Sequence, residues 1–257
     1  MRRRIDINCD LGESYGAFKV GNDARIMPYI TSANIACGLH AGDPMTAAET
    51  IALAKRHNVA VGAHPGFPDL LGFGRREMQL LPEEVQNYTL YQVSALQGFA
   101  QITGDRLQHV KPHGALYNMA VDKEKVAKPI VDAVKALDSS LIVFAPPSSA
   151  LATVAAKAGL RVGYEFFADR AYNSDGTLVS RKLPDSVIEE PLQVVERVVK
   201  AVIEGTVLTS NQEVVNLGKV HTICIHGDNP AAVTLAEALC RGLDKAGIEI
   251  RPIGTFL

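Results

Sequence analysis

Seven short apolar segments of strand type recur along the chain, and segments with helical periodicity separate them. The first begins at residue 5, and the others are 33–37, 59–63, 107–111, 141–145, 161–166 and 222–225. Strands alternating with helices are the signature of repeated βα units and a parallel sheet. We interpret the apolar runs as strands buried on both faces. The pattern predicts a closed (β/α) barrel with fewer than eight regular units; an open doubly wound sheet is the alternative, because spacing does not show closure.

Cap and stop residues place the helices between these strands. Pro44, directly after Asp43, is typical of a helix start, and Gly104 is typical of a helix stop. The predicted helices are 22–30, 44–57, 82–103, 123–137, one that stops at residue 159, 191–205 and 231–246. We expect loops at 70–81 and 173–190, and 206–219 has no clear assignment. Since no linker or change of composition divides the chain, we predict a single domain over residues 1–257.

Composition excludes several classes of function. A net charge of −2 gives no electrostatic reason to expect nucleic acid or a membrane surface as a partner. No apolar run approaches the roughly 18 residues of a membrane helix, and acidic and amide residues interrupt any signal-peptide pattern near the start. The four cysteines lack C-x-x-C spacing, so we interpret them as reduced thiols. The expectation is a soluble cytoplasmic protein.

Acids and histidines gather where the predicted strands end. In the first strand, Ile5 and Ile7 alternate with polar residues, and the pattern breaks at Leu11-Gly12, leaving Asp10 and Glu13 just past the strand end. Later strand ends carry His40 and Asp43, His64 and Asp69, Lys111 and His113, Glu165 with Asp169 and Arg170, and His226 with Asp228. Four of the seven histidines have this position, and His221 precedes the last strand. Because the active site of a parallel barrel lies at the carboxyl ends of its strands, we expect one shared site.

These residue types suit acid–base chemistry near neutral pH. We assign catalytic roles to Asp10, Glu13, His40, His64, Lys111 and His113, and substrate binding to Glu165, Asp169, Arg170, His226 and Asp228. Lys111 and Arg170 are candidates for holding an anionic group or an oxyanion. The chain has no G-x-S-x-G elbow, Cys-His signature, phosphate loop or Rossmann fingerprint, so neither a covalent nucleophile nor a nucleotide site is inferred from its residues.

A metal site is an open alternative. Asp10, His40 and His64 form a carboxylate–imidazole set of the kind that binds a divalent metal. They lack a tight local spacing such as H-E-x-x-H, so we assign no metal unless this alternative holds.

Six long motifs resemble those of the lactam utilisation family, which is the family of the 5-oxoprolinase A subunit. They are D-I-N-C-D-L-G-E-S-Y-G (6–16), A-N-I-A-C-G-L-H-A-G-D-P (33–44), G-A-H-P-G-F-P-D-L-L-G-F-G-R-R (62–76), V-K-P-H-G-A-L-Y-N (110–118), E-F-F-A-D-R-A-Y (165–172) and I-H-G-D-N-P (225–230). The resemblance runs nearly end to end. It implies a distorted seven-stranded (β/α) barrel related in shape to deacetylase barrels. It also implies hydrolysis of 5-oxo-L-proline to L-glutamate, with ATP as co-substrate together with Mg²⁺, and two further subunits, B and C, as partners.

The resemblance does not assign chemical steps to residues, so the roles are hypotheses. Asp10 or Glu13 would be the general base toward water; His40, His64 and His113 would move protons or orient the lactam; and Lys111 and Arg170 would hold carboxylate or phosphoryl oxygens. Two other functions stay open: a metal-dependent, deacetylase-like amidohydrolase that acts alone, and a non-catalytic subunit that binds oxoproline for a partner.

Overall fold

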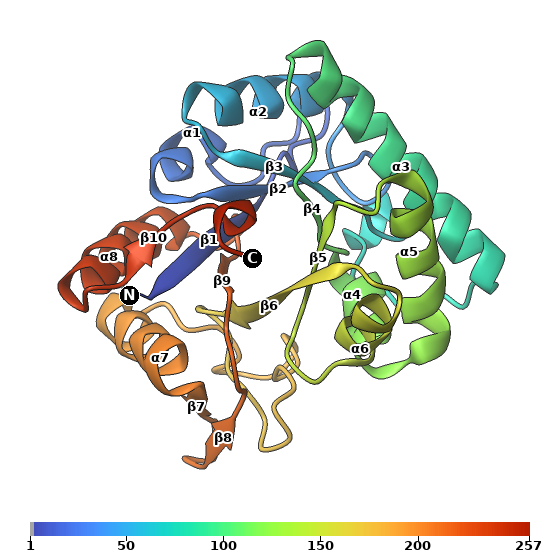
Figure 1. The fold of residues 1–257 in the computed structure, drawn as a ribbon. Coiled ribbons are helices and arrows are strands. Elements are labelled where there is room, and N and C mark those ends of the chain that lie inside the picture. Colours follow the sequence, from blue (N-terminus) through green and yellow to red (C-terminus); the bar gives the residue numbers. More distant parts are fainter. Residues whose placement is uncertain (1–2) are drawn as a thin grey trace.

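Parallel strands form a closed barrel in the computed structural model, which describes residues 3–257 (Figure 1). In order around the barrel they are β1 (Arg4–Leu11), β2 (Ser32–Ala36), β3 (Ala60–His64), β4 (His109–Val110), β5 (Ile142–Ala145), β6 (Arg161–Phe167) and β9 (Thr222–Ile225). Strand β9 pairs in parallel with both β6 and β1, which closes the sheet. The predicted seven-stranded barrel is therefore confirmed, and the open sheet is wrong. A short strand near the end of the chain, β10 (Glu249–Ile250), adds to the start of β1.

Helices surround the barrel (Figure 1). They are α1 (Asp23–Ile26), α2 (Pro44–Arg56), α3 (Pro82–Ile102), α4 (Gly114–Asp122), α5 (Glu124–Leu137), α6 (Ala150–Lys157), α7 (Pro191–Glu204) and α8 (Ala232–Lys245). Three 3₁₀ turns occupy Met27–Tyr29, Leu70–Gly72 and Ile253–Thr255. The carboxylate of Asp43 accepts a hydrogen bond from the Thr46 amide and caps α2, as the Asp-Pro start predicts.

Three features of the chain differ from the prediction. Helix α4 lies where a strand-end loop was expected, because Pro112 and Gly114 resemble a turn while Ala115–Leu116–Tyr117 are buried in the helix. The unassigned segment 206–219 contains an antiparallel hairpin of β7 (Thr206–Leu208) and β8 (Val214–Asn216). Strand β4 has two residues rather than five.

Strand β1 is buried on both faces, but its two faces differ in chemistry. Ile5, Ile7 and Cys9 belong to the apolar core. Asn8 and Asp10 alternate with them and point into the barrel, where Asn8 bonds Thr222 of β9 and Asp10 bonds Asn34 of β2. The interpretation of continuous apolar runs is wrong for this inner face. Asp10 is moreover a residue of the strand itself rather than of the loop after it.

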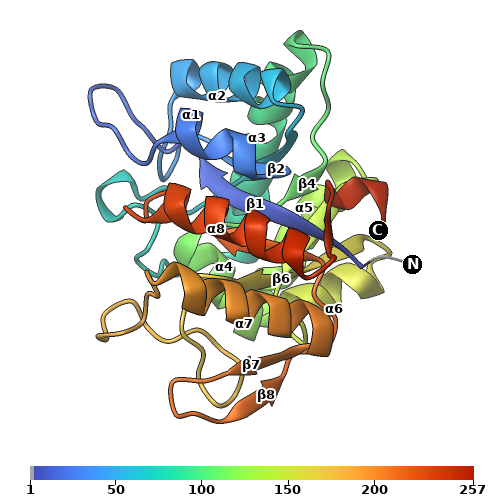
Figure 2. The same cartoon turned by 90° about the vertical axis from the view of Figure 1, so that its left-hand side faces the viewer.

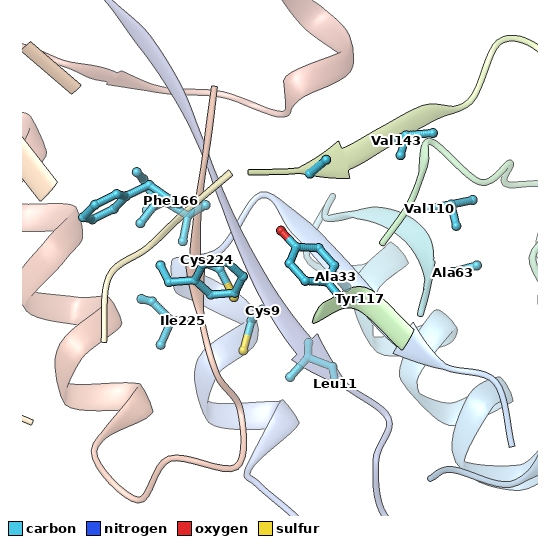
Figure 3. Packing of buried hydrophobic residues seen from close by; sticks show 14 of the residues in the cluster. Cys9, Leu11, Ala33, Ala63, Val110, Tyr117, Val143, Phe166, Cys224 and Ile225 are labelled. Atoms are coloured by element: carbon cyan, nitrogen blue, oxygen red, sulfur yellow. The ribbon is translucent and has the colours of Figure 1, made fainter. Parts of the chain in front are cut away.

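The apolar core includes Leu11 of β1, Ala63 of β3 and Val143 of β5 (Figure 3). All four cysteines are free. Residues 3–257 contain no helix long and apolar enough to cross a membrane. The C-terminus lies at the end of the barrel where β1 begins, and the loops that follow the strands lie at the opposite end (Figure 2). The predicted site residues belong to that opposite end.

Candidate active site

A buried ion cluster of Asp10, Lys111 and Glu165, hereafter the charge cluster, lies inside the barrel toward the carboxyl ends of the strands. The ammonium of Lys111 lies 2.9 Å from Asp10 Oδ1 and 3.0 Å from Glu165 Oε1. It also lies 3.0 Å from the Cys224 sulfur. The second oxygen of Glu165 accepts a hydrogen bond of 2.6 Å from the Tyr117 hydroxyl. Residues from β1, β6, β9 and the start of α4 thus meet around one lysine that is only 2% exposed.

Lys111 and Asp10 hold each other ionised. Burial opposes the ammonium, but the neighbouring carboxyl groups, Asp10 above all, outweigh it and hold the pKa of Lys111 well above its ordinary value. Burial likewise opposes the Asp10 carboxylate, but His64 and Lys111 hold its pKa well below the ordinary value. Burial raises the pKa of the Cys224 thiol, which therefore stays neutral. The cluster thus places two carboxyl groups around one ammonium.

Beside the charge cluster lies a second group, the histidine cluster, made of Glu13, His40, His64 and His113. His64 is the last residue of β3, His40 lies in the segment between β2 and α2, and His113 immediately precedes α4. Nδ1 of His64 lies 2.7 Å from the Lys111 carbonyl oxygen, and Nε2 of His113 lies 2.8 Å from the Phe73 carbonyl oxygen. Since a carbonyl oxygen only accepts, these two nitrogens carry the protons.

The opposite ring nitrogens, Nε2 of His64 and Nδ1 of His113, lie 3.0 Å apart, within hydrogen-bond distance of each other. Burial, followed by the neighbouring histidines, lowers the pKa of His113 well below its ordinary value, so this ring is neutral. The His40 ring stacks on that of His113 with centroids 3.9 Å apart. Both His40 nitrogens are buried without a hydrogen-bond partner among residues 3–257.

Glu13 is the least compensated acid of the site. Its carboxylate oxygen lies 3.8 Å from His113 Nδ1. Burial, and then the charges of Asp10 and Asp228, raise its pKa well above the ordinary value. Of the two carboxylates proposed as general base, Glu13 is thus the more basic, because Asp10 is held as an anion by a cation.

The loop before Arg76 covers the histidine cluster. Gly74 has a φ of +64°, and a Cβ atom there would lie 2.8 Å from atoms of both His40 and His113. Only glycine allows this backbone to approach the imidazoles so closely. The guanidinium of the next residue, Arg75, lies 2.6 Å from Asp228 Oδ2. The Arg181 guanidinium lies 3.3 Å from the same oxygen. These two arginines are the partly exposed cations of the barrel mouth.

The remaining predicted residues form a third group after β6 and β9. Asp169 accepts from Nδ1 of His226 at 2.8 Å and from the Asn229 amide. Burial opposes the anion, but His226 holds the pKa of Asp169 below its ordinary value. Arg170 donates to the backbone carbonyls of Ser186 and Val179, so its guanidinium holds the loop after β6.

The structure regroups the residues of the alternative metal set. His40 and His64 lie with Glu13 and His113, whereas Asp10 groups with Cys224 and His226. Asp10 Oδ1 still lies 3.5 Å from His64 Nε2.

Several site residues were not predicted from the sequence. Asn8 and Asn34 line the barrel below Asp10, Tyr117 bonds Glu165, and Arg75 and Arg181 form the mouth. Tyr117 lies in the K-P-H-G-A-L-Y-N motif, and an α-helical interpretation of residues 114–122 would have put it one turn after His113. The alternation of Asn8 with Ile7 and Cys9 was a similar signal.

A model of the LamB/YcsF family matches residues 5–257. A protein from Pyrococcus horikoshii named as the A subunit of 5-oxoprolinase is 51% identical over 254 residues, which cover 99% of each chain. The protein of the same name from Bacillus subtilis is 50% identical over 250 residues, or 97% of each chain. These matches extend over nearly the whole chain.

Solved structures agree. A lactam utilization protein from Thermus thermophilus superposes with a TM-score of 0.91 at 47% identity, over 97% of this chain and 99% of that one. The catalytic domain of a peptidoglycan N-acetylglucosamine deacetylase from Eubacterium rectale gives a TM-score of 0.51 at 10% identity, over 98% and 89% of the two chains. The second likeness concerns the fold alone, and it agrees with the expected relation to deacetylase barrels.

Proposed function

Because this chain belongs to the LamB/YcsF family, we propose that it is the lactam-hydrolysing subunit of a 5-oxoprolinase. The reaction adds water to 5-oxo-L-proline, breaks its amide C–N bond and yields L-glutamate, while ATP is converted to ADP and phosphate. The relatives' names designate one subunit of an enzyme, which supports an assembly with other polypeptide chains. We assign those partners as the B and C subunits, and ATP with Mg²⁺ as the co-substrate.

The observation that carries this proposal is the convergence of buried acid–base groups at the carboxyl ends of the strands. Glu13, His64 and His113 bring a carboxyl group and two imidazole rings together beside the charge cluster. A five-membered lactam is an unstrained, resonance-stabilised amide, so its hydrolysis needs an activated water and a proton for the departing nitrogen. Phosphorylation of the lactam oxygen by ATP would make the carbon more electrophilic.

The geometry supports a division of roles. Glu13, whose pKa is raised, is the better general base, and the neutral His113 is within reach of the same proton. Lys111 is fully engaged by two carboxylates, so its proposed role is to hold Asp10 as an anion beside His64. The carboxylate of oxoproline would then bind Arg75 and Arg181 rather than Lys111 or Arg170, because the mouth arginines are partly exposed.

The test is to measure glutamate and phosphate release by this chain alone and after addition of its partner subunits. We expect turnover only in the mixture, and a loss of at least about 100-fold for the Asp10→Asn and His64→Ala variants, as is usual for lost proton-transfer groups. The Asp132→Asn variant is a matched control, since Asp132 lies in an exposed pair with Lys128. Wild-type turnover by both site variants would overturn the assignment.

The two other functions give different results in the same assay. ATP-independent hydrolysis by this chain alone would identify an amidohydrolase of the deacetylase kind. Tight oxoproline binding with unchanged turnover in the Asp10→Asn mixture would identify a binding subunit. Either result would exclude the proposed role.

A further inference from the structure

In the histidine cluster, Nε2 of His64 and Nδ1 of His113 point toward each other and lie 3.0 Å apart. Either one shared proton or one cation bound by both nitrogens accounts for so short a distance. The opposite ring nitrogens donate hydrogen bonds to the carbonyl oxygens of Lys111 and Phe73, and these bonds fix the orientation of both rings. This is the arrangement in which a metal-binding histidine is held by a hydrogen bond from its other nitrogen.

The His40 side chain lacks hydrogen-bond partners of its own. Both ring nitrogens of His40 are buried without a hydrogen bond among the described residues, and the residue is 1% exposed. One ligand atom each from Glu13, His40, His64 and His113 lies within 4.8 Å of the others. A single proton shared by His64 and His113 would leave His40 unsatisfied and Glu13 uncompensated.

Distance and charge both favour a cation of charge two. Two imidazole nitrogens bound tetrahedrally to Zn²⁺ lie about 3.3 Å apart, close to the 3.0 Å between His64 and His113. The charge cluster places two carboxyl groups around one ammonium, and Glu13 adds a third carboxyl group beside them. A divalent ion would supply the positive charge that Glu13 needs to ionise in a region where unpaired charge is costly.

We propose that Glu13, His40, His64 and His113 form a binding site for one divalent transition-metal ion of the Zn²⁺ type. Three imidazoles and one carboxylate are the ligands that such ions prefer over Mg²⁺ or Ca²⁺. The inference deepens the proposed function, on which its catalytic meaning rests. A bound metal ion lowers the pKa of its water, so with an ion present Glu13 would be a ligand, and the ion would replace it in the general-base role proposed above.

The experiment uses the full chain alone, stripped with a chelator, without lactam or ATP. Equilibrium dialysis against Zn²⁺ with elemental analysis measures stoichiometry and affinity, and Co²⁺ substitution gives a visible absorption spectrum that reports ligand geometry. We expect one ion per chain. Loss of a group that hydrogen-bonds a metal ligand commonly lowers metal affinity by about 10–100-fold. His113→Ala and Glu13→Gln remove ligands themselves, so each should lower Zn²⁺ affinity by at least about 100-fold.

His57→Ala is the control, because His57 is exposed at the end of α2 and lies outside the cluster. Its affinity should equal that of the wild type. Circular dichroism identifies any variant that fails to fold, and Glu13→Gln, which keeps the side-chain volume, serves if His113→Ala does not fold. Absence of stoichiometric binding by the wild type, or unchanged affinity in a folded ligand variant, overturns the proposal.

Metal binding and lactam turnover are separate readouts. A chain that binds one ion but hydrolyses no oxoproline with its partners refutes the proposed function and supports the metal site. A chain that turns over oxoproline but binds no Zn²⁺ or Co²⁺ refutes only the metal site.

Discussion

Strand β1 carries buried acids at both ends of the barrel interior, and their pKa values are shifted in opposite directions. At the lower end, Asp6 accepts hydrogen bonds from the hydroxyls of Thr31, Ser32 and Thr222. Burial nevertheless raises its pKa to about 6. At the upper end, Asp10 is also buried, yet its pKa is held well below the ordinary value beside His64 and Lys111.

The difference teaches what keeps a buried acid ionised. Hydroxyl groups donate hydrogen bonds but bring no charge, so three of them only partly replace the water that Asp6 loses. An ammonium ion at 2.9 Å from Asp10 supplies the missing positive charge. The acid at the amino ends of the strands therefore has a raised pKa, whereas the acid near their carboxyl ends is held as an anion by a buried ammonium.

Removal of the cation should have the largest effect. Lys111→Met leaves Asp10 and Glu165 buried without their counter-charge, so we expect unfolding free energy to fall by about 3–5 kcal/mol, measured by urea denaturation. Lys128→Met, in an exposed pair, should cost no more than about 0.5 kcal/mol. Addition of Asp10→Asn should restore part of the loss. A loss below about 1 kcal/mol in Lys111→Met would contradict the account of charge compensation.

Asp6 should make the unfolding free energy depend on pH. The folded-state pKa of Asp6, about 6, exceeds the unfolded value of 3.8, so the folded protein binds more protons between these values. This stabilising contribution is present in full below pH 3.8 and is lost as pH rises through about 6. Its size is about 3 kcal/mol for a shift of roughly two pH units. The unfolding free energy, measured by urea denaturation between pH 4 and 7, should fall less with rising pH in Asp6→Asn than in the wild type. An identical dependence on pH in both proteins would refute the assignment.

The hydroxyl that supports the upper end can be tested alone. Tyr117→Phe removes the hydrogen bond to Glu165 Oε2 and leaves a buried oxygen without a donor. Because hydrogen bonds to charged groups contribute about 1.5–3 kcal/mol, thermal or urea unfolding should show a loss of about 2 kcal/mol. Tyr91→Phe, at an exposed position, is the control. Equal stability of the two variants would mean that Lys111 alone compensates Glu165.

The mouth arginines should matter least for stability. Arg181→Gln breaks a partly exposed pair with Asp228, so unfolding free energy should change by less than about 1 kcal/mol. If Arg181 binds the carboxylate of oxoproline, KM should rise several-fold while kcat changes less. Arg241→Gln, in an exposed pair with Glu237, should leave KM unchanged. An unchanged KM in Arg181→Gln would remove Arg181 from the substrate site.

The predicted site residues belong to one end of the barrel, but their partners were not predictable. Strand-end position was readable because Gly12 and Pro65 mark where strands stop, and such breaks are local. That Lys111 bonds Asp10 rather than a substrate depends on a contact 101 residues away in sequence. The orientation of Arg170 toward loop carbonyls depends in the same way on the folded loop after β6. Side-chain pairing is a property of the closed barrel.

By itself, the sequence determined the alternation of most strands and helices, the parallel type of the sheet and the chemical kinds of residue at the strand ends. Periodicity, helix caps and helix-breaking residues act within a few residues, so they can be identified from the sequence. Closure through β9 and β1, the polar inner face and the tautomers of His64 and His113 were decided only by tertiary structure. Each depends on backbone groups that folding alone brings together. The two imidazole rings beside Glu13 are oriented by two carbonyl oxygens that no local pattern identifies.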